Sequence, residues 1–196
     1  MYPSKEIFHF INRISILSEE TWSLLIPHTS EIQLLKDDFF VKENEISQEI
    51  GILTKGIVRS FYTTSDGKEY NKTLFAAPTI IGSYVSIITG QPNRLPQQAL
   101  TDCTVVKIPM NIIQKLSADQ IEIERLRRKI AEMFFVYKEK RELEMALLQA
   151  EERYLIFLQE FPGVEQLIPQ YHIASYLGIS ATQLSRIRNK MSSRAN

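Results

Sequence analysis

The spacing of apolar residues changes near Pro109, and this change constrains the fold of the 196-residue chain more than any other feature. From Ser30 to Pro109, short apolar and β-branched stretches alternate with turn residues, and they occupy residues 32–35, 39–41, 50–53, 57–64, 70–75 and 104–108. Asp66-Gly67 lies between two of these stretches and is the strongest hairpin signal in the chain. Many short strands at such spacing favour an antiparallel barrel or sandwich.

Beyond Pro109 the apolar residues follow a helical period. Five of them step by three and four residues and predict one stripe of a helix from about residue 119 to 147: Ile123, Leu126, Ile130, Met133 and Tyr137. A narrow stripe on a long helix favours a coiled coil with a second copy of the chain, with these five residues as the dimerisation seam. The pattern leaves open a helix that lies on its own barrel. Lys140 and Glu144 continue the stripe with charges, so we expect the pairing to loosen there.

Shorter helices are predicted on both sides of these two regions. The apolar residues between Ser4 and Ile26 fit short amphipathic helices, one of which starts at Ser18. A further helix is expected from about residue 149 to 161, where Pro162-Gly163 ends it. The chain therefore divides into a strand-rich part (1–118), a long helix (119–148) and a C-terminal helical part (149–196), and its class is α+β.

Residues 170–189 have the spacing of a helix-turn-helix. Ala174 is the small residue that lets the second helix approach the first, and Gly178 is suited to the positive φ of the turn. Ser180 stands where the second helix, from about Ala181 to Met191, needs an N-cap. Five apolar residues are expected to lock the two helices together: Ile173, Leu177, Ile179, Leu184 and Ile187.

The charge distribution supports a nucleic-acid contact at this end of the chain. The net charge is zero, but no Asp or Glu follows Glu165, and this stretch carries four basic residues and a net charge of +4: Arg186, Arg188, Lys190 and Arg194. The first 165 residues carry 19 basic and 23 acidic residues, a net charge of −4. A basic segment on an acidic protein is typical of a small DNA-contacting module.

The polar residues of the second helix are the expected DNA contacts. Arg can pair bidentately with guanine, and Gln or Asn can do so with adenine, so Thr182, Gln183 and Arg186 are the expected base contacts. Arg188, Lys190 and Arg194 are expected at phosphates, and Ser180 or Tyr171 can also contact the backbone. Ser185 and Asn189 complete the set of polar side chains expected at the DNA.

Composition argues against several other classes of protein. A single cysteine, Cys103, permits no internal disulfide and no multi-cysteine zinc or iron–sulfur site. His9, His28 and His172 are too scattered to suggest a metal, so no metal site is expected. No apolar run approaches the ~18 residues of a membrane span, which favours a cytoplasmic protein without membrane contact. Because no nucleophile–base set, carboxylate pair or phosphate loop is present, we do not expect an enzyme.

The whole chain resembles the Crp–Fnr family of bacterial transcription regulators. The resemblance rests on residues 51–59 (GILTKGIVR), 66–69 (DGKE), 80–82 (IIG), 150–154 (AEERY), 173–180 (IASYLGIS) and 184–187 (LSRI). The C-terminal motifs are similar to those of the Bacteroidetes branch of the family. It implies an antiparallel β-roll, a double-stranded β-helix like cyclic-nucleotide-binding domains, with flanking helices. A long dimerisation helix and a C-terminal helix-turn-helix would follow this roll.

One departure from the family concerns the effector. The resemblance implies a ligand site at Gly82, Ser83, Tyr84 and Arg94, but cyclic-AMP-binding members carry a Glu where Ser83 stands. Arg94 falls one residue late for the phosphate, and Leu95-Pro96 replaces the small residues that follow it. Pro96 also lacks the N–H that a phosphate cradle would use. We therefore expect that the effector is not cyclic AMP, and the residues identify no cofactor.

The sequence thus predicts a DNA-binding transcription regulator. It would bind a pseudo-palindromic duplex site as a homodimer, under allosteric control from the β-roll, and the resemblance makes RNA polymerase a further candidate partner. The alternative is a ligand-binding or protein-interaction module whose helix-turn-helix is vestigial.

Overall fold

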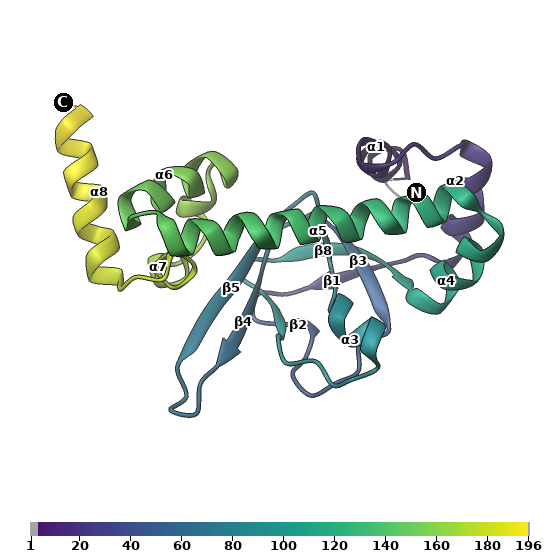
Figure 1. The fold of residues 1–196 in the computed structure, drawn as a ribbon, viewed down its shortest axis with the longest axis horizontal. Coiled ribbons are helices and arrows are strands. Elements are labelled where there is room, and N and C mark those ends of the chain that lie inside the picture. Colours follow the sequence, from purple (N-terminus) through teal and green to yellow (C-terminus); the bar gives the residue numbers. More distant parts are fainter. Residues whose placement is uncertain (1–3, 196) are drawn as a thin grey trace.

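The computed structural model describes residues 4–195 and contains a two-sheet β-roll, a long helix across it and a helical unit beyond this helix (Figure 1). The strands are β1 (Ser30–Leu34), β2 (Phe39–Val41), β3 (Glu49–Lys55), β4 (Ile57–Thr63), β5 (Glu69–Ala76), β6 (Thr79–Ile81), β7 (Gln97–Ala99) and β8 (Cys103–Pro109). The helices are α1 (Ser4–Ile14), α2 (Glu19–Leu25), α3 (Tyr84–Thr89), α4 (Met110–Asp119), α5 (Ile121–Leu147), α6 (Ala150–Glu160), α7 (Gln170–Leu177) and α8 (Ala181–Ala195), with short 3-10 turns η1 (Ile26–His28) and η2 (Val164–Gln166).

The β-roll consists of two four-stranded antiparallel sheets. Sheet A has the order β1-β8-β3-β6 and sheet B the order β2-β7-β4-β5. Their facing sides enclose a small apolar core made of Leu34, Leu53, Val58, Ile81, Ala99, Cys103 and Val105. This arrangement confirms the antiparallel β-roll and the α+β class.

The hairpin expected at Asp66-Gly67 joins β4 to β5. The Thr64 N–H donates to the Lys68 carbonyl at 2.9 Å, and Gly67 has φ 80°, which a side chain would disfavour. Strands β6 and β7 were not predicted, because three residues are too few to show an alternating pattern. Helices α3 and α4 were not predicted either, and α4 follows Pro109 directly.

Helix α5 confirms the predicted long helix, and its first half packs on the outer face of sheet A together with α1 and α2 (Figure 1). Ile123, Leu126 and Ile130 are buried there against residues such as Ile11 and Val106. Ser18 caps α2, accepting from the Thr21 N–H at 3.1 Å, so the predicted helix start is confirmed.

The burial of Ile123, Leu126 and Ile130 revises the expected dimerisation seam. These side chains contact the chain's own sheet and N-terminal helices, which leaves them no surface for a second copy. Periodicity identified residues that share a face of the helix but not the partner of that face. The open alternative, a helix lying on its own barrel, describes this half of α5.

The C-terminal unit, helices α6, α7 and α8, has its own apolar core and also contacts the roll. Phe157, Ile173, Leu177 and Leu184 are almost fully buried in it. Ile57, Leu74 and Leu100 of the β-roll region extend the same cluster. Within residues 4–195, no helix combines the length and apolar character that crossing a membrane requires.

Candidate nucleic-acid interface and sensor pocket

The turn between α7 and α8 has the geometry that the sequence predicts. Gly178 ends α7 with φ 69° and ψ 32°, and its N–H is directed at the carbonyls of Ala174 and Ser175. The positive φ disfavours a side chain at this position, whereas the one near neighbour of an added Cβ is the flexible end of Met145, which can move away. Ser180 Oγ accepts from the Gln183 N–H at 3.1 Å, which confirms the predicted N-cap.

The two helices of the motif are locked by the expected apolar residues. Ile173, Leu177 and Leu184 are almost fully buried, Ile179 and Ile187 pack partly buried against them, and Ala174 is buried at the crossing. Because α7 is buried on most sides, it acts as a support, and α8 lies at the end of the molecule, clear of the β-roll (Figure 1). Helix α8 continues to Ala195, four residues beyond the predicted end.

The expected base contacts lie on the exposed side of α8. Thr182, Gln183, Ser185, Arg186 and Asn189 are all exposed, as is the capping residue Ser180. Positions 182, 185/186 and 189 follow one another at three- and four-residue steps, so they share a face of the helix. Within the described residues, the Arg186 guanidinium has no hydrogen bond or ion pair that would compete with an incoming base or phosphate.

The other basic residues of α8 lie differently. Lys190 pairs with Glu151 of α6, with Nζ and Oε2 2.6 Å apart, and Arg188 is half-buried near the Tyr154 ring. Burial and the neighbouring Glu165 carboxylate raise the pKa of Tyr154 to about 12. The side chain of Arg194 lies outside the described residues. Arg186 is therefore the fully exposed cation among the three described basic side chains of α8 that has no partner in its own chain.

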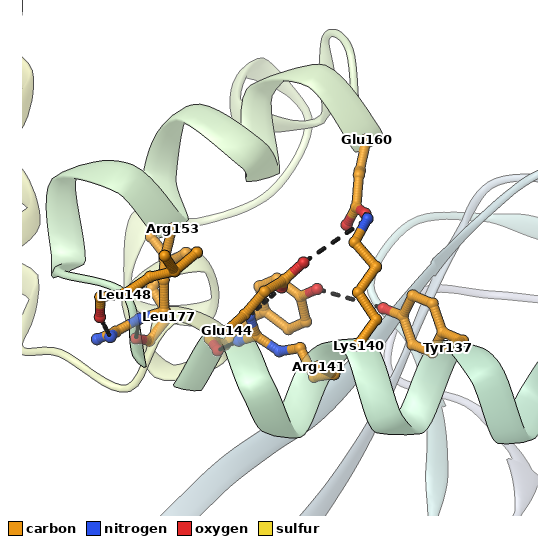
Figure 2. A network of polar contacts seen from close by, with 9 residues as sticks. Tyr137, Lys140, Arg141, Glu144, Leu148, Arg153, Glu160 and Leu177 are labelled. Carbon is orange, nitrogen blue, oxygen red and sulfur yellow. Dashed lines mark hydrogen bonds and ion pairs between the residues drawn. The ribbon is translucent and has the colours of Figure 1, made fainter. Parts of the chain in front are cut away.

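The second half of α5 holds α7 through a cluster of polar and aromatic contacts (Figure 2). The Arg141 guanidinium lies over the Tyr176 ring, 4.0 Å from its centroid, and donates to the Tyr176 carbonyl. The hydroxyls of Tyr137 and Tyr176 are 3.2 Å apart, and burial raises the pKa of both phenols. Tyr137 of the expected seam is thus engaged with α7.

Two further cations join α5 to its neighbours (Figure 2). Lys140 forms an ion pair with Glu160 at the end of α6. Arg153 donates to the carbonyls of Leu148 and Leu177, the second at 3.1 Å from Nε, and so satisfies backbone groups at the ends of α5 and α7. The ends of three helices are therefore fixed to one another by side chains for which the sequence indicated no such contacts.

A second set of contacts ties α7 to strand β5 of the roll. Asn71 donates from Nδ2 to the His172 carbonyl at 3.0 Å, and its backbone N–H donates to Ser175 Oγ at 2.8 Å. Arg59 donates to Asn71 Oδ1 at 3.2 Å. Burial, together with the Arg59 charge, lowers the pKa of His172 to about 4, so the imidazole is neutral at pH 7. The one feature of the sequence that pointed to this contact was Asn71, because asparagine is depleted in strands.

The expected ligand residues of the roll are bonded to other parts of the same roll. The Gly82 N–H donates to Gln97 Oε1 at 2.9 Å, and Gln97 Nε2 donates back to the Gly82 carbonyl at 3.1 Å. Ser83 Oγ donates to Asn93 Oδ1 at 2.8 Å, and Asn93 is itself buried. The backbone donor that would face a phosphate is therefore already satisfied by a buried amide.

Arg94 and Tyr84 lie apart from Gly82's polar contacts. Arg94 is exposed, and the described part of the chain provides no partner for its guanidinium. Tyr84 lines a cavity outside the roll, and Pro96 is buried without an N–H to offer. These residues do not fit the phosphate of a cyclic nucleotide.

The outward face of α5 carries an apolar stripe that the sequence analysis did not identify. Phe135, Val136, Leu143 and Leu147 are exposed and line a groove of about 490 Å³, with Glu139 and Lys140 at its border. Met133, the remaining residue of the expected seam, is also exposed. The signal was present in the spacing of Val136, Leu143 and Leu147, which are seven and four residues apart.

Comparison with known proteins places the roll in a described domain family. Residues 31–120 match the family model of the cyclic nucleotide-binding domain. No curated protein sequence matches the chain. Solved structures, in contrast, match most of its length.

FixK2 from Bradyrhizobium japonicum superimposes with a TM-score of 0.74 at 20% identity, over 85% of this chain and 86% of that protein. CLP from Xanthomonas campestris, described as a c-di-GMP responsive global regulator, gives 0.68 at 14% identity over 91% and 93%. A Eubacterium rectale protein described as a transcriptional regulator of the Crp/Fnr family gives 0.69 at 14% identity over 91% and 85%. The chain therefore has the fold of Crp/Fnr-type regulators, with a β-roll similar to the cyclic nucleotide-binding domain.

Proposed function

We propose that this protein is a sequence-specific, duplex-DNA-binding transcription regulator of the Crp–Fnr type. The observation that carries the proposal is α8, whose polar face is exposed, capped by Ser180 and supported from behind by the buried helix α7. Helix N-terminal residues such as Thr182 and Gln183 meet base edges in such motifs, and Arg186 lies one turn further along the same surface. Solved regulators of the same fold support this assignment.

The regulator works as a homodimer on a pseudo-palindromic site. Phe135, Val136, Leu143 and Leu147 supply an apolar stripe of the length and spacing that a second α5 would cover. A two-fold axis along this stripe brings two copies of α8 to one side of the assembly, where they enter successive major grooves about 34 Å apart. This stripe takes the place of the seam that the sequence suggested.

The regulator responds to an effector other than cyclic AMP. Gln97 and Asn93 satisfy the polar groups of Gly82 and Ser83, and Arg94 points its charge into solvent rather than into the roll. RNA polymerase is a candidate partner of the DNA-bound dimer.

DNA binding by fluorescence anisotropy tests the proposal, with duplexes selected from a random pool and measured across a salt series. Wild type should enrich a palindromic site, and its affinity should fall steeply with salt because bound phosphates release counterions. Arg186→Ala should lose about 1–3 kcal/mol at one base position. Arg128→Ala, which removes the same charge from the exposed side of α5, should keep the site preference.

The alternative module with a vestigial helix-turn-helix makes the opposite prediction. No site would be enriched even at low salt, and Arg186→Ala would change no measured binding. A selected site that both variants bind as wild type does would also contradict the role of α8.

A further inference from the structure

A cavity lies outside the β-roll, between the outer face of sheet A and the helices that cover it. Helices α1, α2, α4 and α5 and strands β3, β6 and β8 all contribute to its lining, and its volume is about 90 Å³. The lining side chains are mostly isoleucines and leucines, among them Ile113 of α4, and Trp22 of α2 joins them. Of the four expected ligand residues, Tyr84 lines this cavity, whereas Gly82, Ser83 and Arg94 do not, so the cavity lies apart from the polar contacts of Gly82.

One charged side chain, Arg127 of α5, is among the described lining residues of this cavity. Its Nη1 donates to Ser117 Oγ at 2.8 Å and to Glu124 Oε2 at 2.7 Å. Its Nε is buried and has no hydrogen-bond partner. A buried donor without an acceptor costs free energy, and such groups in folded proteins normally mark a missing partner.

We propose that this cavity binds a short-chain carboxylic acid, with its carboxylate on Arg127 and its hydrocarbon tail among the apolar side chains. The Nε–H of a guanidinium lies on the side that can bind a carboxylate through two parallel hydrogen bonds. The Nη1 of Arg127 is occupied by Ser117 and Glu124. An apolar lining of this kind stays dry and favours hydrocarbon over water.

The volume limits the size of the acid. A cavity of roughly 150 Å³ lined by Leu, Ile and Phe holds the six carbons of a benzene ring, so about 90 Å³ suits a hydrocarbon tail of about three carbons. A nucleotide is far too large for this site. Butanoate, with three tail carbons and its carboxylate on Arg127, is therefore a suitable probe.

The position of the cavity suggests how the acid would act. Ile123, Leu126 and Ile130 of α5 form part of its wall, so an occupant would lie directly under the half of α5 that is anchored to the roll. A shift of α5 there would move the C-terminal unit at its other end. This regulatory consequence rests on the proposed function, whereas binding of the acid does not.

Trp22, the single tryptophan of the chain, gives a direct measurement because it lines the cavity beside Phe8. The whole chain is titrated with sodium butanoate at constant ionic strength, without DNA, and Trp22 fluorescence is recorded. Butan-1-ol serves as the neutral probe of the same length. Both should give saturable changes, with butanoate the tighter ligand.

Arg127→Gln should weaken butanoate about tenfold or more and change butan-1-ol less than about twofold, because it removes the charge-assisted hydrogen bonds but keeps the apolar wall. Arg128→Gln removes the same charge one residue along, from a side chain paired with Glu132 at the surface, and should leave both affinities unchanged. Ile113→Phe fills the cavity and should abolish both signals.

The proposal is overturned if wild type shows no saturable response to butanoate, if Arg127→Gln weakens both ligands equally, or if Ile113→Phe still binds them. Because no DNA is present in the titration, a failure of the DNA-binding experiment would leave these results unaffected.

Discussion

The two halves of α5 show how one continuous helix serves two different neighbours. In the first half, Ile123, Leu126 and Ile130 are 1%, 8% and 9% exposed because they pack on sheet A. In the second half, Phe135, Val136, Leu143 and Leu147 are 65%, 64%, 52% and 72% exposed on the opposite side. The difference shows that apolar periodicity identifies a shared face, whereas only the tertiary structure identifies what that face contacts.

The inward side of the helix also changes character along its length. It is aliphatic over the roll and becomes polar where it meets α7, with Arg141 and Glu144 at positions that continue the stripe of Ile130. The first half is therefore an apolar anchor to the β-roll, and the second half positions the C-terminal unit through hydrogen bonds and ring contacts.

The largest expected effect tests the anchor. Ile123→Ala should lower the free energy of unfolding by about 2–5 kcal/mol, because it removes a buried aliphatic side chain and enlarges the cavity that Ile123 lines. Ile121→Ala, two residues earlier but exposed to solvent, should change it by less than about 0.5 kcal/mol. Urea unfolding at one fixed protein concentration measures both. Equal effects of the two substitutions would remove the distinction between the inward and outward sides of α5.

The next effect concerns the other support of α7, its contact with β5. The pKa of His172 is lowered to about 4 in the folded chain and returns to about 6.5 on unfolding, so the unfolded chain binds the extra proton between these values. The resulting stability is fully present above about pH 6.5 and is lost as the pH falls towards 4, by up to about 3 kcal/mol.

Unfolding curves of wild type and His172→Gln between pH 4 and 7 isolate this contribution, because the carboxyl groups titrate in both proteins. The difference between them should grow with pH up to about 6.5 and then stay constant. A difference independent of pH would show that the imidazole is not held neutral against β5.

Leu143→Asp tests the outward stripe. A carboxylate in an interface between two copies of α5 should weaken self-association by at least about thirtyfold, which corresponds to about 2 kcal/mol. The same change at Ile121, also exposed but outside the groove, should leave self-association unchanged. Sedimentation across a concentration series measures both variants. If Leu143→Asp associates as wild type does, the stripe is not the contact between copies.

The sequence predicted the parts of this fold whose signals are local. The Asp66-Gly67 hairpin, the Ser18 cap and the turn at Gly178 each depend on a few neighbouring residues, and the structure confirms all three. Contacts between distant segments were not predictable in this way. The hydrogen bond from Asn71 to the His172 carbonyl joins residues about a hundred positions apart, and no pattern in the sequence around either residue indicates it.

The candidate sites follow the same division. The exposed polar face of α8 could be predicted because side chains on one face of a helix recur every three to four residues, and the helix-turn-helix motif determines which face is buried. The cavity at Arg127 could not, because it exists only where five helices and three strands meet. Gln97, which satisfies Gly82, was hidden for a similar reason, since it lies on a strand too short to be recognised.

The smallest effect tests the second half of α5 as the support of the C-terminal unit. Arg141→Lys keeps the charge but loses the planar group that lies on the Tyr176 ring and the fork that reaches the Tyr176 carbonyl and Glu144. Arg128→Lys, on an exposed ion pair of the same helix, is the matched control.

Arg141→Lys should cost about 1 kcal/mol, and the loss should fall on the attachment of α7 rather than on the roll. Hydrogen exchange would then show faster exchange of amides in α7 and unchanged protection in β3 and β8, with Arg128→Lys like wild type. Loss of protection in both regions would mean that the two halves of α5 form one cooperative unit. Protection lost in α7 alone would show that the contact of α5 with the C-terminal unit can open while its contact with the roll stays closed.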